Sequence, residues 1–197
     1  MSAALIIFNL AYLIFFGACF ALRGNYEFIL YAGVCAVFVV WIVLTQAKHR
    51  FPVALLWALS LWGFLHMAGG AIRMGDGVLY DLVLWPVFRR EDVTVLRYDH
   101  AIHAYGFGVA TWVGYALLRF QLKPLPSAGI LVPLLTLIGM GFGALNEMLE
   151  FAAVLILKET GVGGYYNTAF DLLFNFIGAL IAALWIGLYL RKHLHAS

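Results

Sequence analysis

The stretch RYDHAIHAYGFGVAT, residues 97–111, decides the fold, because a run of ionisable side chains leads directly into a long apolar segment. The rest of the chain is equally apolar. Hydrophobic residues make up 64% of the sequence and charged residues 11%, and the mean hydropathy is +0.95. These values lie outside the usual range of soluble domains. The composition therefore predicts an all-α, polytopic membrane protein.

Apolar runs of about 20 residues are long enough to cross ~30 Å of hydrocarbon as helices. Six such runs lie near residues 2–22, 27–47, 53–73, 99–120, 128–157 and 168–190. The longest connection between them covers residues 74–98, which leaves no room for a separate soluble domain. We therefore predict a six-helix bundle formed by one integral membrane domain, residues 1–197.

An even number of spans places both termini on one side of the membrane. Basic residues on that side occur without acids: Lys48, Arg50, Arg119, Lys123, Arg191 and Lys192. The opposite side also has six basic residues, but they are mixed with acids. The Lys/Arg count used by the positive-inside rule is therefore a tie. The basic clusters without acids favour cytoplasmic termini in a multi-pass protein of the cell inner membrane.

Ionisable residues in four spans lie at a similar depth. A rise of 1.5 Å per residue puts them roughly 9–12 Å inside the membrane end that faces residues 74–98. This layer contains His66, His103, Glu150 and Asp171. Glu147 is expected one turn deeper and Asp99 near the rim. His100, about 100° around the helix from Asp99, is expected to face the headgroups.

Helical spacing places these residues on stripes shared with glycine. Asp99, His103 and Gly106 follow an i, i+4, i+7 pattern. Two other spans repeat it, with Gly139, Gly143, Glu147 and Glu150 in one and Asn167, Asp171, Asn175 and Gly178 in the other. We expect these three helices to turn their stripes inward, with His66, Gly69 and Gly70 of the third span beside them. The first two spans have almost nothing polar and are expected to support the bundle from outside.

Three acids at similar depth need compensating charge, because an ionised group inside a bilayer is costly and no Lys or Arg lies nearby in the spans. Protonated acids, charged histidines or a bound divalent cation would each supply it. Imidazole and carboxylate ligands without thiolate suit Zn, Mn or Fe. We predict His103, Glu147, Glu150 and Asp171 as metal ligands, and Asp99 and His66 as catalytic residues that move protons.

Two classes of function fit this pattern. One is an intramembrane metal-dependent enzyme acting on a lipid or amphipathic substrate from the outer leaflet. The other is a non-enzymatic transporter, or an accessory subunit with membrane protein partners, whose buried acids relay protons or fix helix packing. A structural interpretation, in which a lone polar side chain bonds across helices, is the default expectation for His66, Asn146 and Asn175. The lipid bilayer is the expected partner in both, and no nucleic-acid-binding pattern is present.

Four segments carry a resemblance to a known family. In order, they are HMAGG, YDHAIHAYGFG, NEMLEF and NTAFDLLFNFIGALI, within residues 60–185. They resemble motifs of the YjdF-like family of small bacterial inner-membrane proteins, which implies no particular activity. More distantly, Asp99, His103, Glu147 and the run Asp171, Asn175, Gly178 resemble the VanZ-like family, linked to glycopeptide resistance. Glu150 departs from that pattern, where a glutamine is expected.

Overall fold

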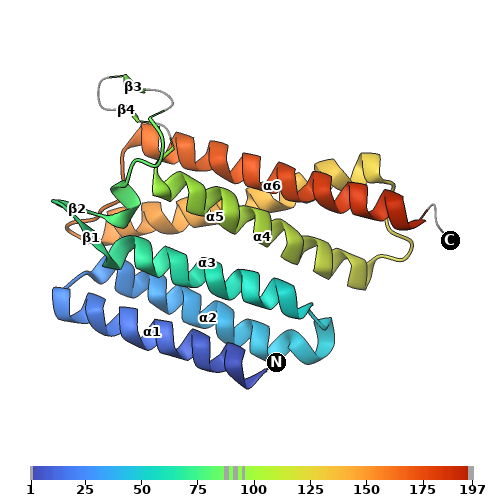
Figure 1. The fold of residues 1–197 in the computed structure, drawn as a ribbon, viewed down its shortest axis with the longest axis horizontal. Coiled ribbons are helices and arrows are strands. Elements are labelled where there is room, and N and C mark those ends of the chain that lie inside the picture. Colours follow the sequence, from blue (N-terminus) through green and yellow to red (C-terminus); the bar gives the residue numbers. More distant parts are fainter. Residues whose placement is uncertain (1, 87–88, 91–92, 95, 195–197) are drawn as a thin grey trace.

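The computed structural model describes residues 2–86, 89–90, 93–94 and 96–194. Within these residues six long helices are apolar enough to cross a membrane, which confirms the predicted six-helix membrane fold. They are α1 (Ala3–Arg23), α2 (Tyr26–His49), α3 (Val53–Ala71), α4 (Tyr98–Gln121), α5 (Ala128–Ile156) and α6 (Tyr165–Leu194). They lie roughly side by side along the long axis of the molecule, with both termini at the same end (Figure 1).

Local signals end one helix and start the next. Ser2 caps α1, with its hydroxyl oxygen accepting the Leu5 backbone N–H at 3.4 Å. Gly24 ends α1 with a φ of 65°, a left-handed conformation that costs glycine little. The Asn25 side chain then accepts the Phe28 N–H at 3.1 Å and caps α2. These caps explain why a sharp turn joins the first two spans.

The connection between α3 and α4 contains short elements at the end of the bundle opposite the termini (Figure 1). Two antiparallel hairpins are formed by β1 (Arg73–Met74) with β2 (Gly77–Val78), and by β3 (Arg89–Arg90) with β4 (Val93–Thr94). A 3₁₀ turn, η1 (Leu79–Asp81), follows β2. This connection therefore covers the membrane end toward which the predicted site faces.

The helices form two groups of three. α4, α5 and α6 pack on one another, α1, α2 and α3 form the second group, and α3 packs on α4 to join them. Glycine permits the closest approach, because a Cβ at Gly178 of α6 would overlap the carbonyl oxygen of Ala104 in α4. A Cβ at Gly143 of α5 would lie 2.7 Å from Nδ2 of Asn175 in α6. The predicted inward stripes of these three helices are therefore correct.

The first two helices lie outside the group formed by α4, α5 and α6, as expected, but each also makes a buried polar contact. Asn9 of α1 is buried and donates to Ser60 Oγ of α3 at 2.7 Å. Glu27, in the first turn of α2, is also buried and accepts the backbone N–H of Gly161 at 2.6 Å. Both bonds join segments distant in sequence, so α1 and α2 contribute polar tertiary contacts as well as apolar packing.

Candidate functional site

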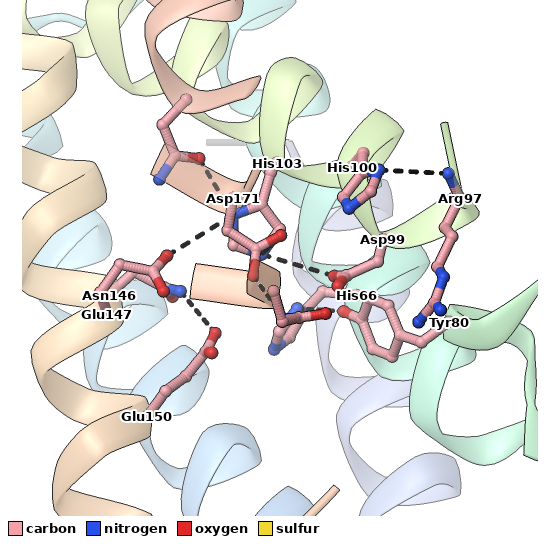
Figure 2. Close-up of polar contacts among 12 residues, drawn as sticks. His66, Tyr80, Arg97, Asp99, His100, His103, Asn146, Glu147, Glu150 and Asp171 are labelled. Carbon is pink, nitrogen blue, oxygen red and sulfur yellow. Dashed lines mark hydrogen bonds and ion pairs between the residues drawn. The ribbon is translucent and has the colours of Figure 1, made fainter. Parts of the chain in front are cut away.

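His103 of α4 lies at the centre of a polar cluster inside the bundle (Figure 2). Its Nε2 atom is 3.5 Å from Asp99 Oδ1 and 3.9 Å from Asp171 Oδ1, and its Nδ1 atom is 3.7 Å from Glu147 Oε1. Three helices thus bring a carboxylate to the same imidazole. Together with Glu150 these residues form what we call the His103 cluster.

Asn175 fixes the orientation of the His103 ring. Its amide oxygen lies 3.0 Å from His103 Nδ1. An amide oxygen can only accept, so Nδ1 donates. Nε2, the other ring nitrogen, faces Asp99 and Asp171. Such a bond on one ring nitrogen commonly orients a histidine that binds a metal through the other.

Asparagines one turn away support two of the acids. Asn167 Nδ2 donates to Asp171 Oδ2 at 2.6 Å, and Asn146 Nδ2 donates to Glu150 Oε1 at 2.7 Å. Each pair has i, i+4 spacing within one helix. Asn146 was expected to bond across helices, and that expectation is wrong. Asn175, whose bond to His103 joins α6 to α4, does bond across helices.

Several acid oxygens at the centre of the cluster have no hydrogen-bond partner. Among the described residues, both carboxylate oxygens of Glu147 and the Oδ1 atom of Asp171 are buried and unbonded. Asp171 is 0% exposed, and the Glu147 side chain is 9% exposed. Buried acceptors are normally satisfied, since leaving one unbonded costs about 1–3 kcal/mol and more for a charged group. The lone pairs of these oxygens are therefore available to bind protons or a cation.

The cluster contains two sets of three candidate metal ligands that share His103. The Asp99 triad is Asp99, His103 and Asp171, and the Glu150 triad is His103, Glu147 and Glu150. Within each triad the ligand atoms lie within 4.8 Å of one another. The four predicted ligands are thus divided between two triads, and Asp99, predicted as a proton carrier, is placed among the candidate ligands. The Asn175 bond occupies Nδ1 of His103, so the geometry favours the Asp99 triad.

His66 of α3 is outside both triads. Its Nδ1 atom is hydrogen-bonded to the hydroxyl of Tyr80 in η1. A Cβ at Gly69 would lie 2.6 Å from the Tyr80 ring, so this glycine makes room for the tyrosine. Burial raises the pKa of Tyr80 well above its usual range, so the hydroxyl stays neutral. Sequence analysis missed Tyr80, although the adjacent glycines in HMAGG indicated a close neighbour.

His100 was expected to face the headgroups, but it lies buried inside the bundle. It is 2% exposed, and its ring stacks on Phe174 of α6 with centroids 4.8 Å apart. Its Nδ1 atom accepts the backbone N–H groups of Leu96 and Arg97 at 3.1 and 3.2 Å. His100 therefore holds the start of α4 in place, and its capping bonds distinguish it from His103, three residues further along.

The fold and the site define a polytopic membrane protein with a buried histidine and carboxylate cluster. A family model described as "Predicted membrane protein (DUF2238)" matches residues 3–192, so the chain belongs to this family. The comparisons with curated proteins and with solved structures find no match. The family description specifies a membrane protein without an activity. The YjdF-like and VanZ-like resemblances stay predictions.

Proposed function

We propose that the protein is an intramembrane metal-dependent enzyme that acts on a lipid or another amphipathic substrate. The observation that carries this proposal is the set of buried, unbonded carboxylate oxygens of Glu147 and Asp171 around His103. A divalent cation bound at the Asp99 triad would bind the Asp171 oxygen directly and offset the charge of the nearby Glu147.

The donor set favours zinc, manganese or iron. One imidazole nitrogen and two carboxylates, as in the Asp99 triad, match a site that keeps open positions for water or substrate. A metal bound there would polarise a substrate oxygen or activate water. Asn175 would orient the histidine ligand, and His66 with Tyr80 would accept or donate protons beside the site.

The distribution of ionisable residues favours an enzyme over a transmembrane proton relay. Asp, Glu, His, Lys and Arg are absent from residues 104–118, 128–146 and 172–190, which form the other halves of α4, α5 and α6. A relay across the membrane needs protonatable groups or water along its length. The cluster instead occupies one half of the bundle, as expected for a site that meets its substrate in one leaflet.

We propose that this leaflet is the outer one and that the termini are cytoplasmic, in the inner membrane of a bacterium. The basic residues near the termini support this orientation. A cysteine in place of exposed Asp76, in a variant lacking Cys19 and Cys35, should react with an impermeant thiol reagent in intact cells. A cysteine in place of exposed Lys123 should react only after lysis. The opposite result would reverse the orientation.

Lipid turnover tests the enzymatic proposal. Purified protein loaded with manganese or zinc is incubated with an extract of bacterial membrane lipids, and the products are followed by mass spectrometry. We expect a lipid species to be consumed by the wild-type protein and not by Asp171→Asn, which keeps the size of the side chain and removes its charge. Equal turnover by a folded Asp171→Asn protein, or no turnover by metal-loaded wild-type protein, would contradict the proposal.

A further inference from the structure

Arg97, at the rim of the His103 cluster, has no ion-pair partner among the described residues. The Nε atom of its guanidinium is buried and makes no hydrogen bond within the part of the chain that the structure describes. The ion pairs found among the described residues all involve His103, so none joins Arg97 to an acid. A guanidinium left unpaired at a membrane rim has the capacity to bind an anion.

The backbone around Arg97 is held rigidly. Its N–H and that of Leu96 donate to His100, and Arg97 forms an isolated β-bridge with Val83. The Tyr98 N–H donates to the carbonyl oxygen of Leu82 at 2.8 Å. Leu96 has a φ of 66°, an uncommon left-handed conformation for a residue with a side chain. Arg97 is thus presented from a fixed point rather than from a mobile loop.

The position of Arg97 relates it to the cluster. In Figure 2 the side chains of Arg97, Asp99 and Tyr80 are drawn on one side of His103, and those of Glu147 and Glu150 on the other. Arg97 precedes Asp99 by two residues in the chain and forms no ion pair with Asp99 or Asp171. An anion bound to Arg97 would therefore lie next to the Asp99 triad. With a cation in that triad, the anion would have positive charge on both sides.

We propose that Arg97 binds the phosphate of an anionic phospholipid and so determines the substrate class of this site. The proposal rests on the proposed function in one respect, because it places the phosphate beside the metal. A phosphate offers several acceptor oxygens to a planar guanidinium, and two parallel hydrogen bonds give a strong, directional contact. The apolar surroundings of the helices accommodate the acyl chains. Because the acids of the cluster repel anions, binding should be tighter when a divalent cation is present.

The test measures lipid binding and metal binding separately in purified, full-length protein. Manganese binding is measured first. Dihexanoyl phosphatidic acid, dihexanoylglycerol and inorganic phosphate are then titrated into protein with and without manganese, by calorimetry in a neutral detergent. Variants are Arg97→Gln and Arg97→Lys, with Arg73→Gln as the matched control, because Arg73 is an exposed arginine in the same connection. Thermal unfolding verifies that each variant is folded.

We expect phosphatidic acid to bind the wild-type protein at least about tenfold more tightly than Arg97→Gln, since charge-assisted bonds contribute about 1.5–3 kcal/mol. Arg97→Lys should fall between them, and Arg73→Gln should match the wild type. Equal affinity of folded Arg97→Gln would overturn the proposal, as would equal losses in both arginine variants, which would indicate general attraction to headgroups.

The remaining titrations separate the possible ligands and the two proposals. Tighter binding of dihexanoylglycerol would exclude the phosphate as the recognised group. Inorganic phosphate binding as tightly as phosphatidic acid would overturn the assignment to a lipid. Failure to bind manganese would count against the proposed function alone, whereas Arg97-dependent binding of phosphatidic acid to that metal-free protein would still support the Arg97 site.

Discussion

Asn9 and Glu147, which lie in the two halves of the bundle, differ in how their polar atoms are hydrogen-bonded. Near the contact of α1 with α3, Asn9 Nδ2 donates to the Leu5 carbonyl oxygen at 2.8 Å and to Ser60 Oγ at 2.7 Å. Asn9 Oδ1 accepts the Tyr12 hydroxyl at 3.1 Å. In the His103 cluster, by contrast, both oxygens of Glu147 are buried without a hydrogen bond.

The difference separates a polar group that stabilises packing from one that can bind a ligand. The amide of Asn9 uses both its donor hydrogens and its acceptor within the protein, so a ligand would have to break existing bonds. The His103 cluster keeps acceptors free at the same level of burial, at a cost to stability that a bound cation would offset. Loss of the Asn9 amide should therefore lower the stability of the fold, whereas loss of an acid of the His103 cluster should lower the affinity for a metal.

The largest expected effect follows from His103→Gln. Nε2 of His103 faces both carboxylates of the Asp99 triad, so its loss removes the only imidazole ligand of either triad among the described residues. We expect the affinity for zinc or manganese to fall by about 100-fold or more, while the helical signal in circular dichroism is retained. Unchanged metal affinity in this variant would mean that the His103 cluster, like the region around Asn9, only stabilises packing.

A comparison of Asp171→Asn with Glu150→Gln tests which of the two triads binds the metal. The two variants make the same chemical change in different triads. Because Asn175 occupies His103 Nδ1, metal affinity should fall by about 10–100-fold in Asp171→Asn and by less in Glu150→Gln. Isothermal titration with manganese measures both. A larger loss of manganese affinity in Glu150→Gln would indicate that the metal binds at the Glu150 triad.

A smaller effect, on stability alone, is expected for Asn9→Leu. The change removes the hydrogen bonds that Asn9 makes to Ser60 and Tyr12. All three residues are buried, with 4–5% exposure. The free energy of unfolding should fall by about 1–3 kcal/mol, with no change in metal affinity. Thermal unfolding in detergent and metal titration measure the two quantities, and Ser60→Ala is the matched control. A loss of metal binding in a folded Asn9→Leu protein would contradict the comparison.

Much of the fold could be predicted because span length and apolar composition determine membrane helices locally. The pairing of Asp99 with His103 was also accessible, since residues at i and i+4 share a helix face. Depth alone placed Asp99 at the rim. Helical side chains tilt toward the N-terminus, however, so the His103 ring leans back toward Asp99 and brings it into the cluster.

Contacts between distant segments could not be predicted from periodicity. Tyr80 reaches His66 only because η1 folds over α3, and Glu27 meets Gly161 across 134 residues of sequence. His100 has the same residue type as His103 and lies three positions away, yet it serves as a cap because α4 begins beside it. Tertiary position, rather than residue type, separates these roles.

The metal content of the wild-type protein shows whether the His103 cluster binds a metal. Protein purified without chelators and without an immobilised-metal column is analysed by inductively coupled plasma mass spectrometry, alongside the Glu147→Gln, Glu150→Gln double variant and His103→Gln. We expect about one divalent transition-metal ion, or a close pair, per wild-type chain and a clear loss of metal in folded His103→Gln. Wild-type protein that is metal-free, binds no added zinc, manganese or iron, and remains stable would contradict this expectation.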